Sequence, residues 1–362
     1  MKIALVYDHI NKIGGAERIL EALHELFPKA PLYTLVADTK KAKWAKKFQI
    51  HTSFVQNIPG AKSYHEFFPI LPIFAFEKFN FDDFDVVISV TSAEAKGIIT
   101  STKTLHICYC LTPTRYIWSH YREYFSNKWM RRLSYPVVVL MRMWDVLAAN
   151  RPDEYVTISN NVAKRIYKYY RRHADLIYPP VDVNKFTPQK NKTEKDNYFL
   201  VVSRLVKYKH VEIAIDACNQ LNLPLKIIGD GFEKNNLKEI SGPTIEFLGN
   251  LTDSDLIRYY QGCRALIFAQ EEDFGITAVE ALSCGKPVIA FGYGGAKEII
   301  TEGITGEFFY KQNKQALAEK LANFDDNKYL SKNCWQQAQK FSVERFKFEF
   351  LNYIISKRSI FK

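Results

Sequence analysis

Short apolar runs that alternate with stretches of helical periodicity are the feature of this sequence that most limits its fold. Residues 2–7, KIALVY, form the first apolar run, and Ile19 and Leu23 then lie on one helical face. Runs of strand length recur at residues 32–36, 86–90, 105–110, 155–158, 199–202, 225–228, 245–248, 265–269, 287–290 and 307–309. Strands that alternate with helices form parallel sheets covered on both faces. The sequence therefore predicts an α/β protein.

The alternation is interrupted by one long segment rich in proline and polar residues. Residues 178–186 read YPPVDVNKF, and TPQKNKTEKDN follows, which is typical of a linker between domains. A chain of 362 residues with 47% hydrophobic residues is large enough for two cores. We therefore expect two doubly wound, Rossmann-like domains, residues 1–182 and 183–340, with a hinge at 179–195.

Composition argues against several classes of protein. The six cysteines show neither a C-x-x-C motif nor zinc-site spacing, which fits a reducing cytoplasm. No stretch approaches the ~20 apolar residues of a membrane span, and the first residues, MKIALVYDH, are typical of a strand rather than a signal peptide. The net charge of +11 indicates an anionic partner: nucleic acid, acidic lipid or a phosphorylated substrate. Because no zinc-finger, RRM or basic-zipper pattern is present, we expect no nucleic-acid partner.

The stretch 269–288, AQEEDFGITAVEALSCGKPV, carries the strongest sign of a binding site. Its helix begins after Gly275, and a helix start offers unpaired backbone N–H groups and the positive end of the dipole, which suit a phosphate. Glu272 precedes that start, and Glu280 follows Gly275 by about 7–8 Å, roughly the span from a diphosphate to a ribose. The residues alone fit either a nucleotide-diphosphate site with two carboxylates or a helix cap and an ordinary solvated glutamate.

Basic and glycine residues follow the neighbouring strands of the same half. Arg204 and Lys209 come after the strand at 199–202, where a guanidinium fork and an ammonium could neutralise a diphosphate. Gly229 and Gly231 follow the next strand, and these loops allow a close approach of backbone to ligand. A solvated basic loop explains Arg204 and Lys209 equally well when they are considered alone.

The first half offers weaker signals. Gly14 and Gly15 follow the first strand but do not match G-x-G-x-x-G, so a nicotinamide dinucleotide site has little support. The acids at 83–85 resemble a D-x-D metal motif, but they precede a strand, whereas ligands bind beyond the carboxyl ends of strands. We therefore expect no metal site.

Two aromatic and basic stretches follow in the first half. The segment 113–124 contains Arg115, Tyr116 and His120 and should lie at the ligand-facing edge of the sheet, as candidates for the acceptor side. Residues 128–149 form a long helix with arginines beside an apolar run too short to span a bilayer. Core packing is the default interpretation of that helix, and an interfacial amphipathic surface is the alternative.

Taken together, these motifs resemble a known family. SRLVKYK, IIGDG, FLGNL, EEDFGITAVEA, GKPVIAFGYGGAKEII and EGITGEFF, in that order, resemble the retaining nucleotide-sugar glycosyltransferases of family 4. GGAERILEAL, PLYTLV, TSFVQ, HICYCLTPTRY, ISNNVAKRI and YPPVDVNKF are similar to bacterial mannosyltransferase-type members that build surface polysaccharides. The resemblance covers nearly the whole chain. It implies the GT-B fold, with two Rossmann-like domains that face a central cleft, and a last helix, about 341–362, that packs back on the first domain.

The resemblance also implies roles for single residues. Arg204 and Lys209 match the basic pair on the donor diphosphate. Glu272 matches the acid that faces the donor sugar, and Glu280 the one that binds the ribose. The donor-binding residues so implied are Gly14, Gly15, Gly229, Gly231, Phe274, Gly275, Ile276 and Glu280. Leu111 stands where the family commonly has a histidine that contacts the sugar.

The activity implied is transfer of a hexose from a nucleotide diphosphate, GDP-mannose first, with retention at the anomeric carbon and without metal or cofactor. The acceptor implied is a lipid-linked saccharide or polysaccharide in the synthesis of O-antigen, lipopolysaccharide or capsule. An anionic membrane surface would then be a partner, with the enzyme peripheral on the inner face of the cell membrane. The alternatives are a nucleotide-sugar epimerase on the same fold and a basic nucleic-acid-binding protein.

Overall fold

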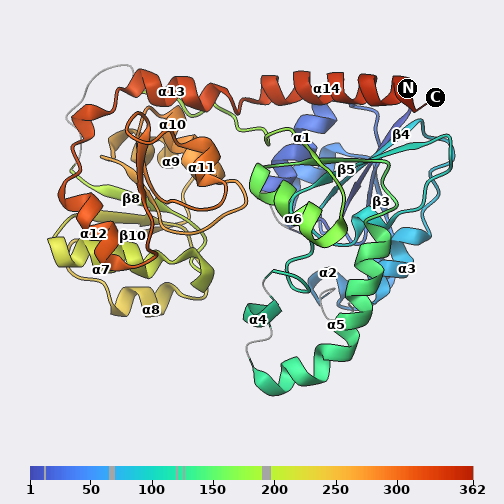
Figure 1. Ribbon diagram of the computed structural model, residues 1–362, viewed down its shortest axis with the longest axis horizontal. Helices are drawn as coiled ribbons and strands as arrows, with labels where there is room; N and C mark the ends of the chain where they lie inside the picture. The colour runs from blue at the N-terminus through green and yellow to red at the C-terminus, as the bar shows by residue number, and fades with distance from the viewer. Residues whose placement is uncertain (12–13, 65–69, 120, 125–126, 190–196, 362) are drawn as a thin grey trace. The chain divides into compact units, whose positions relative to one another are not determined.

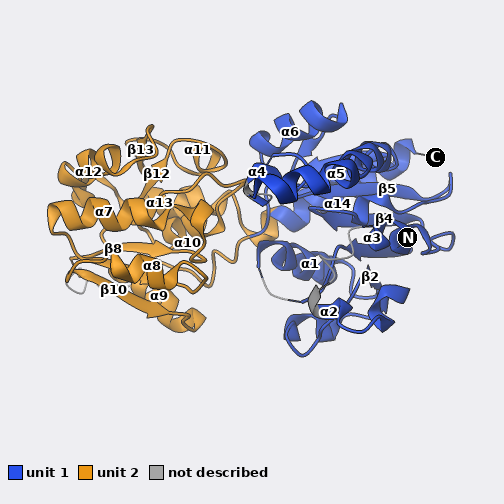
Figure 2. Cartoon of the chain, turned by 90° about the horizontal axis from the view of Figure 1, so that it is seen from below, with its two compact units in different colours: residues 1–180, 346–362 blue, residues 181–345 orange. Residues whose placement is uncertain are grey.

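The structure is a computed structural model that describes residues 1–11, 14–64, 70–119, 121–124, 127–189 and 197–361. The chain divides into two compact units, shown in Figure 2. Unit 1 comprises Met1–Pro180 with Phe346–Lys362, and unit 2 comprises Val181–Arg345. The sequence placed the first division at 182/183 and the second at about 340/341, so the observed boundaries lie a few residues away from both.

Unit 1 is built on a seven-stranded parallel sheet with the strand order β3-β2-β1-β4-β5-β6-β7. Its strands are β1 (Ile3–Tyr7), β2 (Leu32–Thr34), β3 (Ile50–Thr52), β4 (Val86–Thr91), β5 (Leu105–Cys110), β6 (Glu154–Thr157) and β7 (Asp175–Leu176). Every residue of β1, β4 and β5 is buried, as expected for central strands covered on both faces. Since β2 and β4 lie on opposite sides of β1, the chain reverses its direction of winding between β1 and β4.

The helices of unit 1 cover this sheet, and one of them projects from it. They are α1 (Gly15–Leu26), α2 (Ala61–Tyr64), α3 (Leu71–Glu77), α4 (Tyr121–Tyr124), α5 (Lys128–Ala148), α6 (Asn160–Tyr170) and α14 (Val343–Ile360), with 3-10 turns at Lys43–Lys47, Phe54–Asn57 and Ala95–Gly97. Figure 1 shows the N-terminal turns of α5 extending away from the sheet. The side chain of Asn127 caps α5 by accepting from the backbone N–H of Trp129.

Helix α14 closes unit 1, although it comes from the far end of the sequence. Phe346, Phe350 and Ile354 are fully buried, and the rings of Phe346 and Phe350 lie 6.0 and 5.8 Å from that of Tyr109 on β5. At the end of the helix, Lys357 Nζ lies 2.8 Å from Glu154 Oε2. Unit 1 is therefore formed by two segments that are distant in the sequence.

Unit 2 repeats the architecture with six parallel strands in the order β10-β9-β8-β11-β12-β13. The strands are β8 (Phe199–Val202), β9 (Leu225–Ile228), β10 (Ile245–Gly249), β11 (Leu266–Phe268), β12 (Val288–Phe291) and β13 (Gly306–Phe309). The helices are α7 (Val211–Leu221), α8 (Lys234–Glu239), α9 (Asp253–Gly262), α10 (Ile276–Ser283), α11 (Ala296–Ile299), α12 (Lys314–Ala322) and α13 (Ser331–Gln339), with 3-10 turns at Lys207–Lys209 and Asp326–Lys328. The reversal of winding falls here between β8 and β11. In open α/β sheets, ligands bind beyond the carboxyl ends of the two strands at such a reversal.

Among the described residues, no helix combines the length and the hydropathy needed to cross a bilayer.

Candidate functional site

The candidate site of unit 2 lies at the carboxyl ends of β8 and β11, where the winding reverses. Lys209, at the end of the 3-10 turn after β8, forms an ion pair with Glu272 in the loop after β11. The same oxygen of Glu272 accepts from Gln270 Nε2 at 3.2 Å. Both side chains are largely covered, with 13% of Lys209 and 24% of Glu272 exposed. Two of the residues expected at the diphosphate and the sugar thus meet at the predicted edge of the sheet.

Arg204 lies at the same edge and keeps its charge available. Its guanidinium donates to the hydroxyl of Tyr208 at 2.6 Å, and it forms no ion pair with any residue that the structure describes. Lys209 Nζ lies 5.1 Å from the ring centre of the same Tyr208. An anion that approached this loop would therefore meet one cation without a carboxylate partner and a second cation that Glu272 partly neutralises.

The glycines after β9 allow the backbone to pack directly against the loop that carries Arg204. Gly229 has φ +131°, and a Cβ there would lie 1.9 Å from the carbonyl oxygen of Ser203. A Cβ on Gly231 would lie 2.1 Å from the carbonyl oxygen of Leu205. These contacts are possible only for glycine. The two glycines hold the Arg204 loop in place, and direct contact with a ligand stays a prediction.

A second pair of glycines holds the loop that carries Glu272. A Cβ on Gly294 would lie 2.3 Å from the carbonyl oxygen of Glu272, and one on Gly295 would lie 2.4 Å from that of Phe274. The N–H of Gly295 also donates to the Glu272 carbonyl at 2.8 Å. The backbone on both sides of the carboxylate is thus fixed by the loop after β12.

Helix α10 begins at this loop without a side-chain cap. Its N-cap is Gly275, with φ +117°, and Glu272 does not cap it, so the capping interpretation of Glu272 is wrong. Phe274 is buried and packs edge-on against Phe341 at 5.4 Å, which anchors the turn before the helix, and Ile276 begins the helix. A first helical turn without a side-chain cap offers unpaired backbone N–H groups, and that of α10 lies at the same edge of the sheet as Lys209 and Arg204.

Glu280 is not an ordinary solvated glutamate. Only 2% of it is exposed, and its carboxylate accepts a hydrogen bond from Tyr260 Oη on α9 at 3.0 Å. Burial of a carboxylate requires partners, so this acid is held for a structural or binding purpose. Its predicted contact with a ribose stays a prediction.

In unit 1 the corresponding edge is organised by Asp8, directly after β1. Its carboxylate accepts from Thr91 Oγ1 at 2.7 Å, from the N–H of Ser92 at 2.8 Å and from that of Ala95 at 2.9 Å. Asp8 thereby joins the loops after β1 and β4 across the reversal of winding. Gly14 is the extended N-cap of α1, and Gly15 is its first residue.

Tyr116 is hydrogen-bonded to the carboxylate of Glu94 by its hydroxyl. Burial, and then the charge of Asp8, raise the pKa of Glu94 from its ordinary 4.5 to about 7, against the lowering effects of Tyr116 and Lys96.

Arg115 lies half-buried beside Tyr116. The third acceptor-side candidate, His120, lies outside the described residues, and at Leu111 the structure gives a backbone bond to the Thr91 carbonyl at 2.8 Å.

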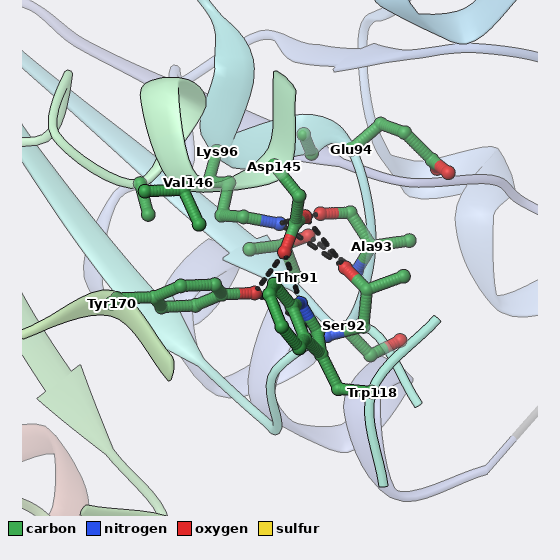
Figure 3. Close-up of polar contacts among 12 residues, drawn as sticks. Thr91, Ser92, Ala93, Glu94, Lys96, Trp118, Asp145, Val146 and Tyr170 are labelled. Carbon is green, nitrogen blue, oxygen red and sulfur yellow. Dashed lines mark hydrogen bonds and ion pairs between the residues drawn. The ribbon is translucent and has the colours of Figure 1, made fainter. Parts of the chain in front are cut away.

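Below this edge, Asp145 on α5 collects four hydrogen-bond donors in the interior of unit 1 (Figure 3). They are Lys96 Nζ at 2.6 Å, Thr114 Oγ1 at 2.9 Å, Trp118 Nε1 at 2.7 Å and Tyr170 Oη at 2.7 Å. Burial alone would lower the pKa of Lys96, but the Asp145 carboxylate outweighs it and raises that pKa above its ordinary value. The hydrogen bonds of Asp145 thus connect α5 and α6 with the loops that follow β4 and β5.

The sequence interpretation did not single out Asp8, Glu94, Lys96 or Asp145 as site residues. Asp8 could have been found, because it directly follows the first strand, at the edge where ligands bind. Lys96 and Asp145 gave no local signal, since each is a single charge in an otherwise ordinary stretch. Among the described residues, no cluster of three or more His, Cys, Asp or Glu could hold a metal ion.

Comparisons with known proteins show that this chain is similar to glycosyltransferases. Residues 182–341, nearly all of unit 2, match the family model described as glycosyl transferases group 1. The uncharacterized glycosyltransferase MJ1178 of Methanocaldococcus jannaschii is 29% identical over 59% of this chain and 61% of its own length. O-antigen chain mannosyltransferase C of Escherichia coli is 29% identical over 42% of this chain and 44% of its own. The matched regions thus span less than two thirds of either relative.

A solved structure covers the whole fold. Anabaena Alr3699/HepE in complex with UDP superposes with a TM-score of 0.74 and 20% identity, over 98% of this chain and all of that one. The predicted GT-B fold, with two Rossmann-like domains, is confirmed.

Proposed function

We propose that this protein is a retaining glycosyltransferase that moves a hexose, mannose in the first instance, from a nucleotide-diphosphate sugar to a lipid-linked or polysaccharide acceptor. The observation that carries the proposal is the convergence of Arg204, Lys209, Glu272 and the start of α10 at one edge of unit 2. The match of the same unit to the group 1 glycosyl transferases supports it. The likeness to an O-antigen chain mannosyltransferase supports mannose and a role in surface polysaccharide synthesis.

The chemistry follows from the charges at that edge. A departing nucleotide diphosphate carries the negative charge that develops during transfer, and Arg204, Lys209 and the first turn of α10 stabilise it electrostatically. This needs no metal ion or cofactor. Lys209 forms an ion pair with Glu272. A diphosphate competes for Lys209 and releases the carboxylate of Glu272 toward the donor sugar, so donor binding itself prepares the acid for its role.

The acceptor is proposed to be a saccharide linked to a membrane lipid through phosphate. Arg115 and Tyr116 lie at the carboxyl edge of the unit 1 sheet, where an acceptor hydroxyl would be positioned. Work at the inner face of the cell membrane accounts for the net charge of +11, because that surface is anionic.

Glu272→Ala tests the site. We expect the variant to lose most transfer activity while keeping its melting temperature within a few degrees, because Glu272 is partly exposed at the edge of the sheet. Glu271→Ala is the matched control, since it removes the same charge from an exposed neighbouring position. Transfer is measured with radiolabelled nucleotide sugars, after a thermal-shift screen has identified the donor that stabilises the fold. Turnover of Glu272→Ala equal to that of Glu271→Ala would contradict the assignment.

Arg204→Ala separates donor binding from folding. Because the exposed Arg204 side chain makes one hydrogen bond to the described residues, to the half-buried Tyr208, its loss should leave stability unchanged. We expect weaker binding of the nucleoside diphosphate by about 10-fold or more in calorimetry, as for the loss of one charge-assisted contact worth ~1.5–3 kcal/mol. Unchanged affinity and turnover would remove Arg204 from the diphosphate site.

A further inference from the structure

Helix α5 is apolar on two opposite faces. Val138, Met141 and Ala148 face the interior of unit 1 and are buried. On the other face, an apolar stripe of exposed side chains runs along the helix at alternating spacings of four and three residues. The stripe consists of Trp129 (71% exposed), Leu133 (79%), Pro136, Leu140 (63%), Met143 (60%) and Leu147 (65%). Core packing therefore explains only one face of this helix, and the stripe is apolar surface that the described part of the chain leaves uncovered.

A basic cavity adjoins the stripe at the N-terminal half of α5. It has a volume of about 1090 Å³, and five cations line it: Arg122, Lys128, Arg131, Arg132 and Arg142. Among the described lining residues there are also Ser119 and four aromatic side chains: Trp118, Tyr121, Tyr135 and the stripe residue Trp129. None of the described residues that line the cavity is acidic.

No carboxylate in the described ranges of the chain pairs with the cations of the cavity. Arg142 donates through Nε to the carbonyl of Ile117 at 2.7 Å and lies over the rings of Trp118 and Tyr121. The other four form no ion pair with any residue in the described part of the chain. Elsewhere in the same unit, cations such as Lys357 and Arg151 have carboxylate partners. The charge at α5 is thus arranged for an anion from outside the chain.

We infer that α5 docks unit 1 on an anionic lipid bilayer, with the apolar stripe in the outer acyl region and phospholipid phosphates in the basic cavity. A helix with an apolar face beside arginines, lysines and interfacial aromatics suits this position. A second copy of the chain fits less well, because the exposed surface of α5 carries cations and its one acid, Asp145, is buried. The inference deepens the proposed function by naming the surface that meets the lipid-linked acceptor, but it needs neither donor nor acceptor.

Vesicle sedimentation of the full chain tests the inference. We expect binding to vesicles of phosphatidylcholine with roughly one third phosphatidylglycerol, and much weaker binding to phosphatidylcholine alone. Arg131→Ala with Arg132→Ala should weaken binding about 20-fold or more, because each cation near an anionic surface contributes about 5-fold. Lys43→Ala with Lys46→Ala is the matched control, because it removes the same charge from exposed positions on unit 1. Its vesicle affinity should fall only by what the loss of long-range attraction explains, to within about 2-fold.

The apolar stripe needs its own variants. Leu140→Ser with Leu147→Ser leaves the buried face intact, so the fold should survive while vesicle binding falls at least 10-fold. On binding, the emission of Trp129 should shift to the blue and be quenched by brominated lipid, and Trp129→Phe should remove that response.

Three results would overturn the inference. The first is no binding to the anionic vesicles at low salt. The second is an equal loss of vesicle binding in the Arg131/Arg132 variant and the Lys43/Lys46 variant. Binding would then depend on the net charge of the chain and not on α5. The third is a dimer in solution that Leu140→Ser with Leu147→Ser converts to monomer, which would assign the stripe to a second copy. Because no sugar donor is present in these experiments, each result stands whatever the outcome for Glu272.

Discussion

At the scale of single residues, the interior of unit 1 depends on a buried ion pair. Lys96 and Asp145 are each 2% exposed in their side chains, and their charges are compensated almost entirely by each other and by the three neutral donors around Asp145. Removal of one partner leaves the other charge buried and unpaired, which costs about 3–5 kcal/mol.

We therefore expect Lys96→Met to lower the free energy of unfolding by about 3–5 kcal/mol, measured by urea denaturation. Lys96→Met combined with Asp145→Leu should recover part of that loss, because no charge then remains buried. A single variant that is as stable as the wild type would show that water reaches Asp145.

Glu94 gives a pH-dependence of stability with a definite sign. Its carboxyl faces Asp8, Tyr116, Lys96 and Asp145, and its pKa rises from 4.5 in the unfolded chain to about 7 in the folded one. Between these values the unfolded state binds fewer protons than the folded state, so this group lowers the free energy of unfolding as the pH rises.

Glu94→Gln removes that dependence. We expect the variant to gain stability relative to the wild type between about pH 5 and about pH 8, and to show no relative change below about pH 4. Chemical denaturation at a series of pH values checks this. A difference that stays constant across the range would mean that Glu94 titrates normally.

At the scale of elements, α14 completes the core of unit 1 with one face only. Phe350 is fully buried beside Tyr109, whereas Phe348 on the same helix is 69% exposed. Phe350→Ala should therefore lower the free energy of unfolding by about 3–5 kcal/mol. Phe348→Ala is the control and should change it by no more than about 0.5 kcal/mol. Equal effects of the two variants in urea denaturation would show that the helix does not pack as described.

The elements themselves were largely predictable. The strands of a parallel sheet are continuous apolar runs, so β8 and β5 fall where the sequence placed them, at 199–202 and 105–110. The faces of α5 were not predictable, because an apolar residue every three or four positions fits a core face and an exposed stripe equally well. The burial of Glu280 was also hidden, since its partner Tyr260 comes from another helix.

At the scale of the whole molecule, the two units differ in how much of their site could be recognised from sequence motifs. The family model covers 182–341, which is nearly the whole of unit 2, where the expected donor residues Arg204, Lys209 and Glu272 lie. Unit 1, with Asp8 and the basic cavity, lies outside it. Motifs in the sequence therefore indicated candidate donor-binding residues in unit 2. The contacts of unit 1 could not be predicted, because they join side chains from several strands and helices that are distant in the sequence.

The return of α14 to unit 1 has a consequence for biosynthesis. The ribosome makes Met1–Pro180 first and then all of Val181–Arg345 before Phe346 exists. At translation rates of about 5–20 residues per second, the nascent first unit waits about 10–30 s for its last helix. During that time the sheet around Tyr109 has no cover from Phe346 and Phe350, so a chaperone that shields apolar surface would find its binding site there on the growing chain.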